Sequence, residues 1–440
     1  MRSKASNRTS RGIPRRVHVI AATLALTGAS FYEQAYAYNI DLRFPHLGGY
    51  KISSPQNYGD SAIQSQLARL DFVILDFYFN WGGGGAAMNK AVDDIKVKNP
   101  NIVIVDYCIP GQVHSTSTGQ KPLRDKLEAQ KWYLYQSGAG GSKVLDGTFL
   151  TPNHTDFVPT DANGKRWNTW FADYHFDQVW KYINKLDGTF TDNFFWKPAV
   201  NGDWNRDGTS DSQNNSTVGQ WWRDGMIRHA NQIKTRMPGK LVTGNLGRSG
   251  QPEANNTGFN QQLHGGVLER YIGETWSAEN QGWKTMMDRY RKVMALLAAP
   301  RLLIFNMKGN PTDYKTFRYG FASALMDDAY FDFSNGTGGA IYKPGVVWFD
   351  EYDLAGQANT KWLGTAIDGP QFAAWQNGVY RRRFQNGMAL VNPRGNGNRT
   401  VTIEPGYRRF LGNQARTINN GNPATSITLQ DRDGILLKKN

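Results

Sequence analysis

Short apolar runs alternate with amphipathic segments between residues 50 and 333. The runs are rich in β-branched and aromatic residues and are short, so each predicts a strand buried on both faces. The segments between them carry apolar residues near helical spacing and predict amphipathic helices. The predicted strands are 72–79, 102–107, 188–195, 241–245, 266–270 and 302–306, and the predicted helices are 86–98, 121–136, 176–186, 218–236, 283–298 and 314–329.

This alternation of strand and helix predicts an α/β fold with a parallel sheet. The number of repeats and the length of the segment favour a closed (β/α)8 TIM barrel over an open sheet. A dinucleotide-binding fold is disfavoured, because the glycine run 82–85 follows a strand but lacks the G-x-G-x-x-G spacing.

The alternation of strand and helix patterns ends near Asp332. Short candidate strands are separated there by clusters of Gly, Asn and Pro, which is typical of a small antiparallel β-sandwich. We therefore expect a barrel domain over residues 38–350 and a β-sandwich domain over 351–440. The candidate strands are 372–383, 387–392, 399–403 and 427–437.

Residues 1–37 have the composition of a secretory signal peptide. A basic segment precedes the apolar run 17–31, and Ala35 and Ala37 supply the small residues that a signal peptidase reads. The run is short for a membrane span, although an uncleaved anchor is the alternative. We predict cleavage before Tyr38, a secreted or periplasmic location, and no stable membrane insertion after cleavage.

Charge and residue usage narrow the possible functions. The formal charge of +14 is dispersed and accompanies no nucleic-acid-binding motif, so nucleic acid is not the expected partner. A basic exported protein is suited to meet an anionic polysaccharide or a membrane surface. Cys108 is the only cysteine, which excludes an intramolecular disulfide. The histidines lack zinc-ligand spacing, and no G-x-S-x-G motif is present.

Two acids are candidates for catalysis. In a parallel barrel, functional side chains lie at the C-terminal ends of the strands. Glycoside hydrolysis commonly uses two carboxyl groups, one as the acid and one as the nucleophile or base. Asp192 ends an apolar strand beside aromatic residues, and we predict it as nucleophile or base. We predict Glu269 as the acid, with Glu274 as its competitor.

Other polar residues near the predicted strand ends could contact a sugar. Amide and carboxylate groups bind hydroxyls, and an indole ring can stack on a sugar face. The alternative for each acid is a helix cap, and for each tryptophan a place in the core. The residues predicted to bind substrate are Asp76, Asp106, Asn193, Trp196, Asn245 and Glu274.

The segment 203–211 fits the D-x-N-x-D-G pattern of a calcium loop. Oxygen ligands at alternate positions, with glycine at the turn, suit a hard cation. The twelfth position is Asn214 in place of glutamate, so the EF-hand pattern is incomplete, and an Asx-rich turn is the alternative. We predict a structural calcium ion and no organic cofactor. The predicted ligands are Asp203, Asn205, Asp207, Thr209 through its carbonyl, and Asp211.

Five segments of the chain carry a resemblance to a known family. They are 188–193, 203–211, 348–353, 384–393 and 432–437. Together they resemble the hypothetical glycosyl hydrolase 15 group. The resemblance covers most of the chain after the signal peptide and implies a barrel glycosidase with a C-terminal β-sandwich. By analogy with barrel glycosidases, an acid at the fourth strand is a plausible nucleophile, which matches Asp192. The partner acid is not fixed by these motifs, so Glu269 is inferred from the residues.

The sequence thus predicts an exported glycoside hydrolase that cleaves a polysaccharide or oligosaccharide, with an anionic glycan as one candidate. Two alternatives remain open. A barrel of this kind can lose its chemistry and serve as a glycan-binding or exopolysaccharide-matrix protein. A lyase acting on an acidic glycan would instead need a Tyr, His or Lys base beside an arginine.

Overall fold

The computed structural model describes residues 40–247, 257–336 and 344–440. Residues 41–440 form one compact unit. The predicted signal peptide over residues 1–37 lies outside the described residues. Within the described ranges, no helix combines the length and the apolar content that crossing a membrane requires.

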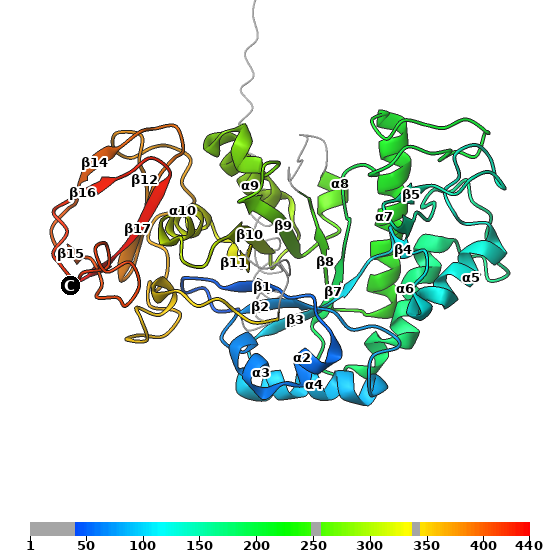
Figure 1. Ribbon diagram of the computed structural model, residues 1–440, viewed down its shortest axis with the longest axis horizontal. Helices are drawn as coiled ribbons and strands as arrows, with labels where there is room; N and C mark the ends of the chain where they lie inside the picture. The colour runs from blue at the N-terminus through cyan, green and yellow to red at the C-terminus, as the bar shows by residue number, and fades with distance from the viewer. Residues whose placement is uncertain (1–39, 248–256, 337–343) are drawn as a thin grey trace, which may run out of the picture. The chain divides into compact units, whose positions relative to one another are not determined.

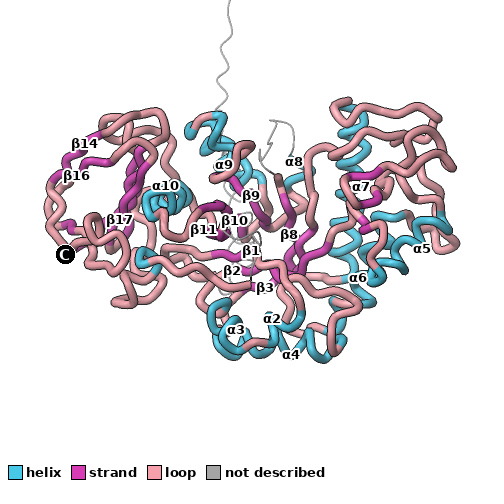
Figure 2. Tube along the Cα trace, in the orientation of Figure 1, coloured by secondary structure: helices cyan, strands magenta, loops and turns pink. Residues whose placement is uncertain are grey.

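Eight parallel strands form a closed barrel with helices outside it (Figures 1 and 2). A parallel bridge between Leu47 and Phe331 joins the first strand to the last and closes the ring. The predicted (β/α)8 barrel is therefore confirmed. In spatial order the strands are β1 (Gly48–Tyr50), β2 (Phe72–Leu75), β3 (Val103–Cys108), β7 (Gly188–Thr191), β8 (Leu241–Asn245), β9 (Gly265–Ile272), β10 (Leu302–Gly309) and β11 (Tyr330–Asn335).

The helices that follow these strands lie close to the predicted segments, with one clear exception. The sequence predicts a helix over 176–186, whereas the structure has α6 at Trp167–Gln178. Aromatic residues face several sides of α6, so its sequence shows no single apolar stripe. The main helices are α2 (Pro55–Gly59), α3 (Ser61–Leu67), α4 (Gly84–Lys98), α7 (Ser216–Arg236), α8 (Thr257–Asn260), α9 (Trp283–Leu296) and α10 (Tyr314–Ala324).

A long excursion separates β3 from α6. The predicted helix 121–136 is shorter in the structure, where α5 covers Lys121–Gln130. Lys131 adopts a left-handed backbone with φ of 54°, which ends the helix. The excursion also contains a small antiparallel sheet of β4 (Val113–His114), β5 (Leu145–Asp146) and β6 (Phe149–Leu150).

Alternation along each barrel strand decides which side chains point inward. The rings of Tyr50 and Phe190 come from strands that are not neighbours, yet their centroids lie 5.5 Å apart, so they meet inside the barrel. Val73 and Ile104 belong to the cluster that includes the helices, so they point outward. Because side chains alternate with a period of two, these positions fix the orientation of every later residue on the strand.

The C-terminal residues form two antiparallel sheets, as expected for a small all-β region. Met388 and Leu390 pack into a core between the sheets, whereas Ala389 and Val391 face the barrel-side core. The predicted strand 427–437 is two strands in the structure. The larger sheet contains β12 (Tyr380–Phe384), β13 (Gly387–Asn392), β17 (Asp433–Lys439) and β15 (Tyr407–Arg408), and the smaller contains β14 (Arg399–Thr402) and β16 (Ser426–Leu429). The predicted domain boundary at residue 350 stays a prediction.

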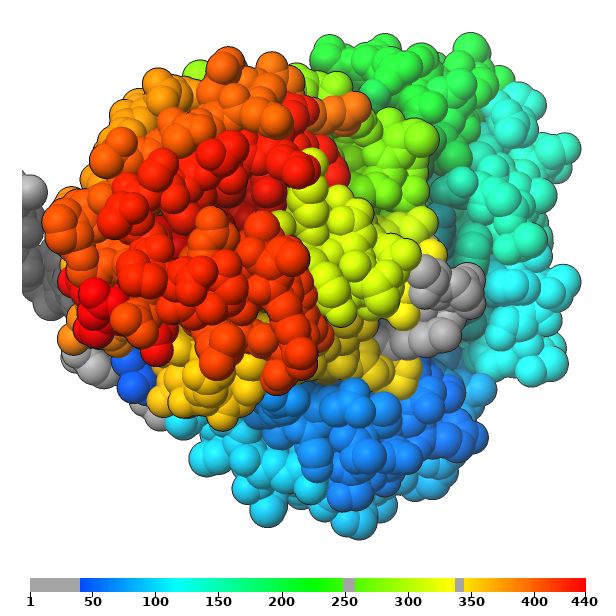
Figure 3. All heavy atoms as spheres, turned by 60° about the vertical axis from the view of Figure 1, so that its left-hand side comes forward, coloured from blue at the N-terminus to red at the C-terminus, as the bar shows by residue number. Residues whose placement is uncertain are grey.

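Helix α10 joins the barrel to the larger C-terminal sheet. In Figure 3 the orange and red C-terminal residues lie directly beside the yellow-green part of the chain that includes α10. Arg318 on α10 is 4% exposed, and its guanidinium donates to the Gly434 carbonyl at 2.9 Å and to Asp433 at 3.1 Å. A Cβ on Gly434 would lie 2.5 Å from the Arg318 carbonyl oxygen, so this close approach requires glycine.

We expect Gly434→Ala to lower the free energy of unfolding by about 1–3 kcal/mol, because the added methyl group forces α10 and β17 apart. Gly369→Ala is the matched control, since a Cβ there meets nothing within 4 Å. Urea unfolding followed by tryptophan fluorescence measures both variants. Equal stability of the two variants would show that the space between α10 and β17 can accommodate a methyl group at position 434.

Candidate active site

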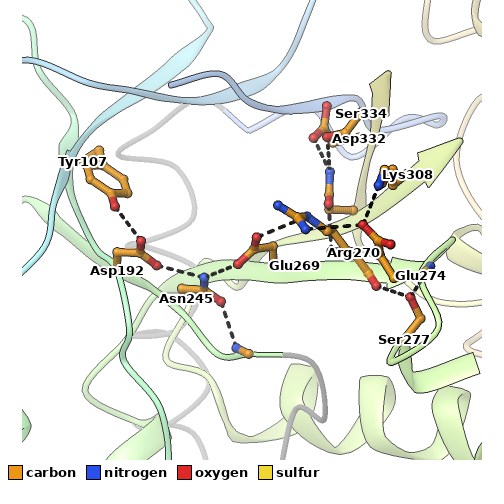
Figure 4. A network of polar contacts seen from close by, with 12 residues as sticks. Tyr107, Asp192, Asn245, Glu269, Arg270, Glu274, Ser277, Lys308, Asp332 and Ser334 are labelled. Carbon is orange, nitrogen blue, oxygen red and sulfur yellow. Dashed lines mark hydrogen bonds and ion pairs between the residues drawn. The ribbon is translucent and has the colours of Figure 1, made fainter. Parts of the chain in front are cut away.

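The C-terminal ends of four barrel strands bring polar side chains together at one mouth (Figure 4). Asp192 follows β7, and Asn245 and Glu269 lie on β8 and β9. Tyr107 lies on β3 and points inward, as shown by its ring contact with Phe190 at 5.9 Å. The alternation that fills the barrel interior therefore also assembles this network.

Asn245 connects the two predicted catalytic acids. Its amide nitrogen donates to Asp192 Oδ1 at 2.9 Å and to Glu269 Oε2 at 2.8 Å. Sharing one nitrogen keeps these two oxygens, the facing atoms of the two carboxylates, within about 6 Å of each other. The amide oxygen of Asn245 accepts from the Gly247 backbone at 2.9 Å. Asn245 thus positions the acids, and its predicted contact with a sugar hydroxyl stays a prediction.

Asp192 is held by several donors in a buried setting. Tyr107 donates its hydroxyl to Asp192 Oδ2 at 2.5 Å, and the Asn193 backbone donates to Oδ1 at 2.8 Å. Burial raises the pKa of Asp192, and the charge of Glu269 adds to this rise. The hydrogen bonds from Tyr107 and Asn245 oppose it, because they stabilise the ionised carboxylate.

Glu269 and Glu274 have different surroundings. Glu269 shares Asn245 with Asp192, and its other oxygen lies 3.5 Å from Arg270 Nε. Glu274 contacts two cations, Lys308 at 2.6 Å and Arg270 at 3.3 Å. Glu269 reaches Asp192 through the shared Asn245 amide, whereas the contacts of Glu274 are to Lys308 and Arg270. The geometry therefore favours Glu269 over Glu274 as the acid.

A second network lies beside the first and supports it. Asn306 on β10 donates to Asp332 at 2.6 Å and accepts from the Arg270 backbone at 2.8 Å. The other Asp332 oxygen pairs with Lys51 at 3.1 Å, and both side chains of this pair are almost fully buried. This network fixes the backbone next to Glu269. Sequence reasoning did not single out Lys51, Asp332 or Tyr107, although alternation along β3 could have identified Tyr107 as an inward-facing residue.

Asp76 follows β2 and, by the same alternation, points toward the mouth. Among the described residues, none donates a hydrogen bond to its carboxylate. Burial raises the pKa of Asp76 well above its usual value, and the charge of Asp106 adds to this. An acid with these properties at a barrel mouth remains a candidate for substrate contact.

The structure turns Asp106 away from the mouth, which corrects its predicted contact with substrate. Asp106 is fully buried and accepts from the Trp180 indole at 2.8 Å and from the Phe77 backbone at 2.7 Å. His175 on α6 lies 3.1 Å from the same carboxylate. Asp106 is an outward-facing residue of β3, so it ties the strand to the helices.

Asn193 and Trp196 lie in the connection after β7. Asn193 has a left-handed backbone with φ of 56° and faces a recess beside the mouth. One face of the Trp196 ring is covered by the Arg223 guanidinium at 3.7 Å, which leaves at most the other face for a sugar. The recess is also lined by Gly111, Gln112, Asp146, Phe195, Trp204 and Trp222.

The predicted calcium ligands lie further along the same connection. Asp203 and Asp211 accept hydrogen bonds from backbone amides, and Asp207 lies on the surface. Nowhere in the described ranges do three or more His, Cys, Asp or Glu side chains form a group that could hold a metal. Any cation here would therefore depend on amide and carbonyl oxygens as well as carboxylates.

Solved structures with similar folds include glycoside hydrolases. The glycoside hydrolase domain of PelA from Pseudomonas aeruginosa has 12% identity and a TM-score of 0.41, over 69% of this chain and 99% of that one. An α-amylase from Lactobacillus plantarum has 9% identity and a TM-score of 0.49, over 89% and 98% of the two chains. The fold assignment rests on the strand order of the chain itself and not on these likenesses.

A comparison with curated proteins found no match. A comparison with protein families matches residues 99–388 to hypothetical glycosyl hydrolase family 15. The match spans Asp192, Asn245 and Glu269, and it confirms the resemblance drawn from the sequence motifs. Because it covers more than half of the sequence, the chain belongs to hypothetical glycosyl hydrolase family 15.

Proposed function

We propose that the protein hydrolyses glycosidic bonds of a polysaccharide or oligosaccharide with Asp192 and Glu269 as the catalytic pair. The observation that carries this proposal is the bridge from one Asn245 nitrogen to both carboxylates. Two acids held this closely at the mouth of a barrel match the requirement of glycoside hydrolysis. Family membership supports the same class of reaction. Secretion rests on the predicted signal peptide.

The separation of the two acids favours a retaining mechanism. In the first step the Asp192 carboxylate attacks the anomeric carbon while Glu269 protonates the departing glycosidic oxygen. In the second step the ionised Glu269 takes a proton from water, whose oxygen replaces Asp192 at the anomeric carbon. Both steps use about 5–5.5 Å between the carboxyl groups, which is compatible with their shared contact to Asn245.

Tyr107 and Asn245 prepare Asp192 for its role as the nucleophile. A buried carboxyl group tends to stay protonated, and a protonated Asp192 could not attack a sugar. The donors from Tyr107 and Asn245 oppose this effect of burial. Arg270, 3.5 Å from Glu269, is placed to stabilise the ionised form of Glu269 between the two steps.

We expect Asp192→Asn to abolish hydrolysis while the fold is retained, because an amide cannot act as nucleophile. Glu269→Gln should lower turnover by about 10²–10⁴-fold through loss of the general acid. Reducing-sugar release from a panel of bacterial and plant polysaccharides measures both. Asp224→Asn is the control, because Asp224 is an acid on α7 whose carboxylate accepts from Gln220 on the same helix. Activity of Asp192→Asn at the level of this control would refute the assignment.

The products of a retaining enzyme keep the anomeric configuration of the bond that is cleaved. We expect proton NMR, recorded early in the hydrolysis of an active substrate, to show the anomer of the substrate before mutarotation. First appearance of the opposite anomer would mean that water attacks directly, and Asp192 would then act as a base.

Tyr107→Phe should move the acidic limb of the kcat/KM profile to higher pH. Asp192 must be ionised to attack, and the Tyr107 hydrogen bond lowers the pKa of Asp192. Removal of this bond raises that pKa further, so more alkaline conditions are needed for activity. Tyr182→Phe serves as the control, because Tyr182 is 47% exposed on the surface. If the acidic limb of Tyr107→Phe stays at the same pH or moves to lower pH, the assigned role of Asp192 is contradicted.

A further inference from the structure

The connection between β7 and α7 contains a closed loop with inward-facing backbone amides. A bridge between Gly202 and Asp211, with hydrogen bonds of 3.1 and 2.8 Å, closes the loop. Inside it, the Gly208 amide donates to Asp203 at 3.0 Å, and the Thr209 amide donates to Asp207 Oδ1 at 2.8 Å. These bonds alone would describe an Asx-rich turn.

One atom of this loop is not explained by a simple turn. Asp203 is 2% exposed, and its Oδ2 accepts from the backbone amides of Gly208 and Gly138. Its Oδ1 is buried and has no hydrogen-bond partner among the residues that the structure describes. Burial of a carboxylate oxygen without a partner is unfavourable, and such an oxygen calls for a ligand. Since Oδ2 of the same group is fixed to the loop amide of Gly208, the unpartnered oxygen also lies at the loop.

The surrounding oxygens suit a hard cation. Asp203, Asn205 and Asp207 stand at alternate positions, and Thr209 follows at the position that offers a backbone carbonyl in calcium loops. Gly208 has φ of 95°, which is the left-handed turn that such a loop needs at its sixth position. Calcium accepts this mixture of carboxylate, amide and carbonyl oxygens, whereas zinc prefers nitrogen and sulfur.

Several departures from a full calcium loop set the expected strength of binding. Asp211 Oδ2 already accepts from the Trp204 backbone at 3.0 Å, and Asp207 Oδ2 accepts from the Asn205 side-chain amide at 2.8 Å, a contact that the cation must replace. Asn214 occupies the position of the usual bidentate glutamate and is contacted by Lys197. Because this loop has fewer charged ligands than a complete EF-hand loop, calcium binding should fall in the weak range of extracellular calcium modules, with a Kd of about 10⁻⁴–10⁻³ M.

We propose that Asp203, Asn205, Asp207 and the Thr209 carbonyl bind a calcium ion that completes the coordination of the buried Asp203 oxygen. The ion joins this loop to the turn at Gly138, whose amide already contacts Asp203 at 2.6 Å. Trp204, next to Asp203, lines the recess that Asn193 also faces. The ion therefore stabilises one wall of the recess beside the mouth, and the site stands independently of the proposed hydrolysis.

The test uses the chelator-treated protein and needs no substrate. Titration calorimetry with CaCl₂ should give one site per chain, and Tb³⁺ should show luminescence sensitised by Trp204. Asp203→Asn and Asp207→Asn should each weaken calcium binding at least about tenfold, because each removes a charged ligand. Asp207 is exposed, so its variant should fold even where Asp203→Asn disturbs the loop. Asp125→Asn, an exposed acid on α5, is the matched control and should bind as the wild type does.

Two results would overturn the proposal. The first is no heat and no sensitised luminescence up to about 10 mM cation, well above the expected Kd. The second is calcium binding that stays unchanged in both Asp203→Asn and Asp207→Asn, which would place the ion elsewhere. Addition of Mg²⁺ should displace calcium poorly, because Mg²⁺ demands a small octahedral site and gives up its water reluctantly.

Discussion

Two carboxylates held by one buried amide nitrogen form the interaction around which the barrel mouth is arranged. Asp192 and Glu269 are half-buried acids, and their charges repel. Asn245 donates to both, Tyr107 donates to Asp192, and Arg270 lies beside Glu269. These contacts allow the pair to be close without both acids being protonated, as two-carboxylate chemistry requires.

The barrel supplies the precision of this arrangement. Closure of the ring by the Leu47–Phe331 bridge fixes the register of neighbouring strands, and alternation fixes which side chains point inward. A second buried network through Lys51, Asp332 and Asn306 then holds the backbone at Arg270. The larger C-terminal sheet packs on α10 through Arg318, and Arg432 beside it pairs with Glu279 in the connection after β9.

Much of this arrangement could be predicted from the sequence. The apolar runs predicted six of the barrel strands, and the strand-end rule selected Asp192, Asn245 and Glu269. The sequence does not predict β1, because this strand has three residues and two of them are glycines. It does not predict β11, because this strand lies where the alternation of strand and helix patterns ends.

The remaining differences have a common cause in tertiary contacts. Asp106 lies near the end of β3 and Asp192 directly follows β7, but the two-residue alternation turns Asp106 toward His175 and Trp180, which are far away in the sequence. The sequence selects Asn245 as a polar strand end but does not predict that its partners are two acids from neighbouring strands. Register between strands decides such partners, and a single strand sequence does not contain it.

The assignment of Asp192 as nucleophile can be tested by trapping the covalent intermediate. A panel of 2-deoxy-2-fluoro glycosyl fluorides slows both steps and, with a good leaving group, lets the glycosyl-enzyme accumulate. Peptide mass spectrometry of the labelled protein then locates the sugar. We expect a single adduct on the peptide that contains Asp192, with the bond on its side chain. An adduct on Glu269, Glu274 or Asp76 would contradict it and would require the roles at the barrel mouth to be reassigned.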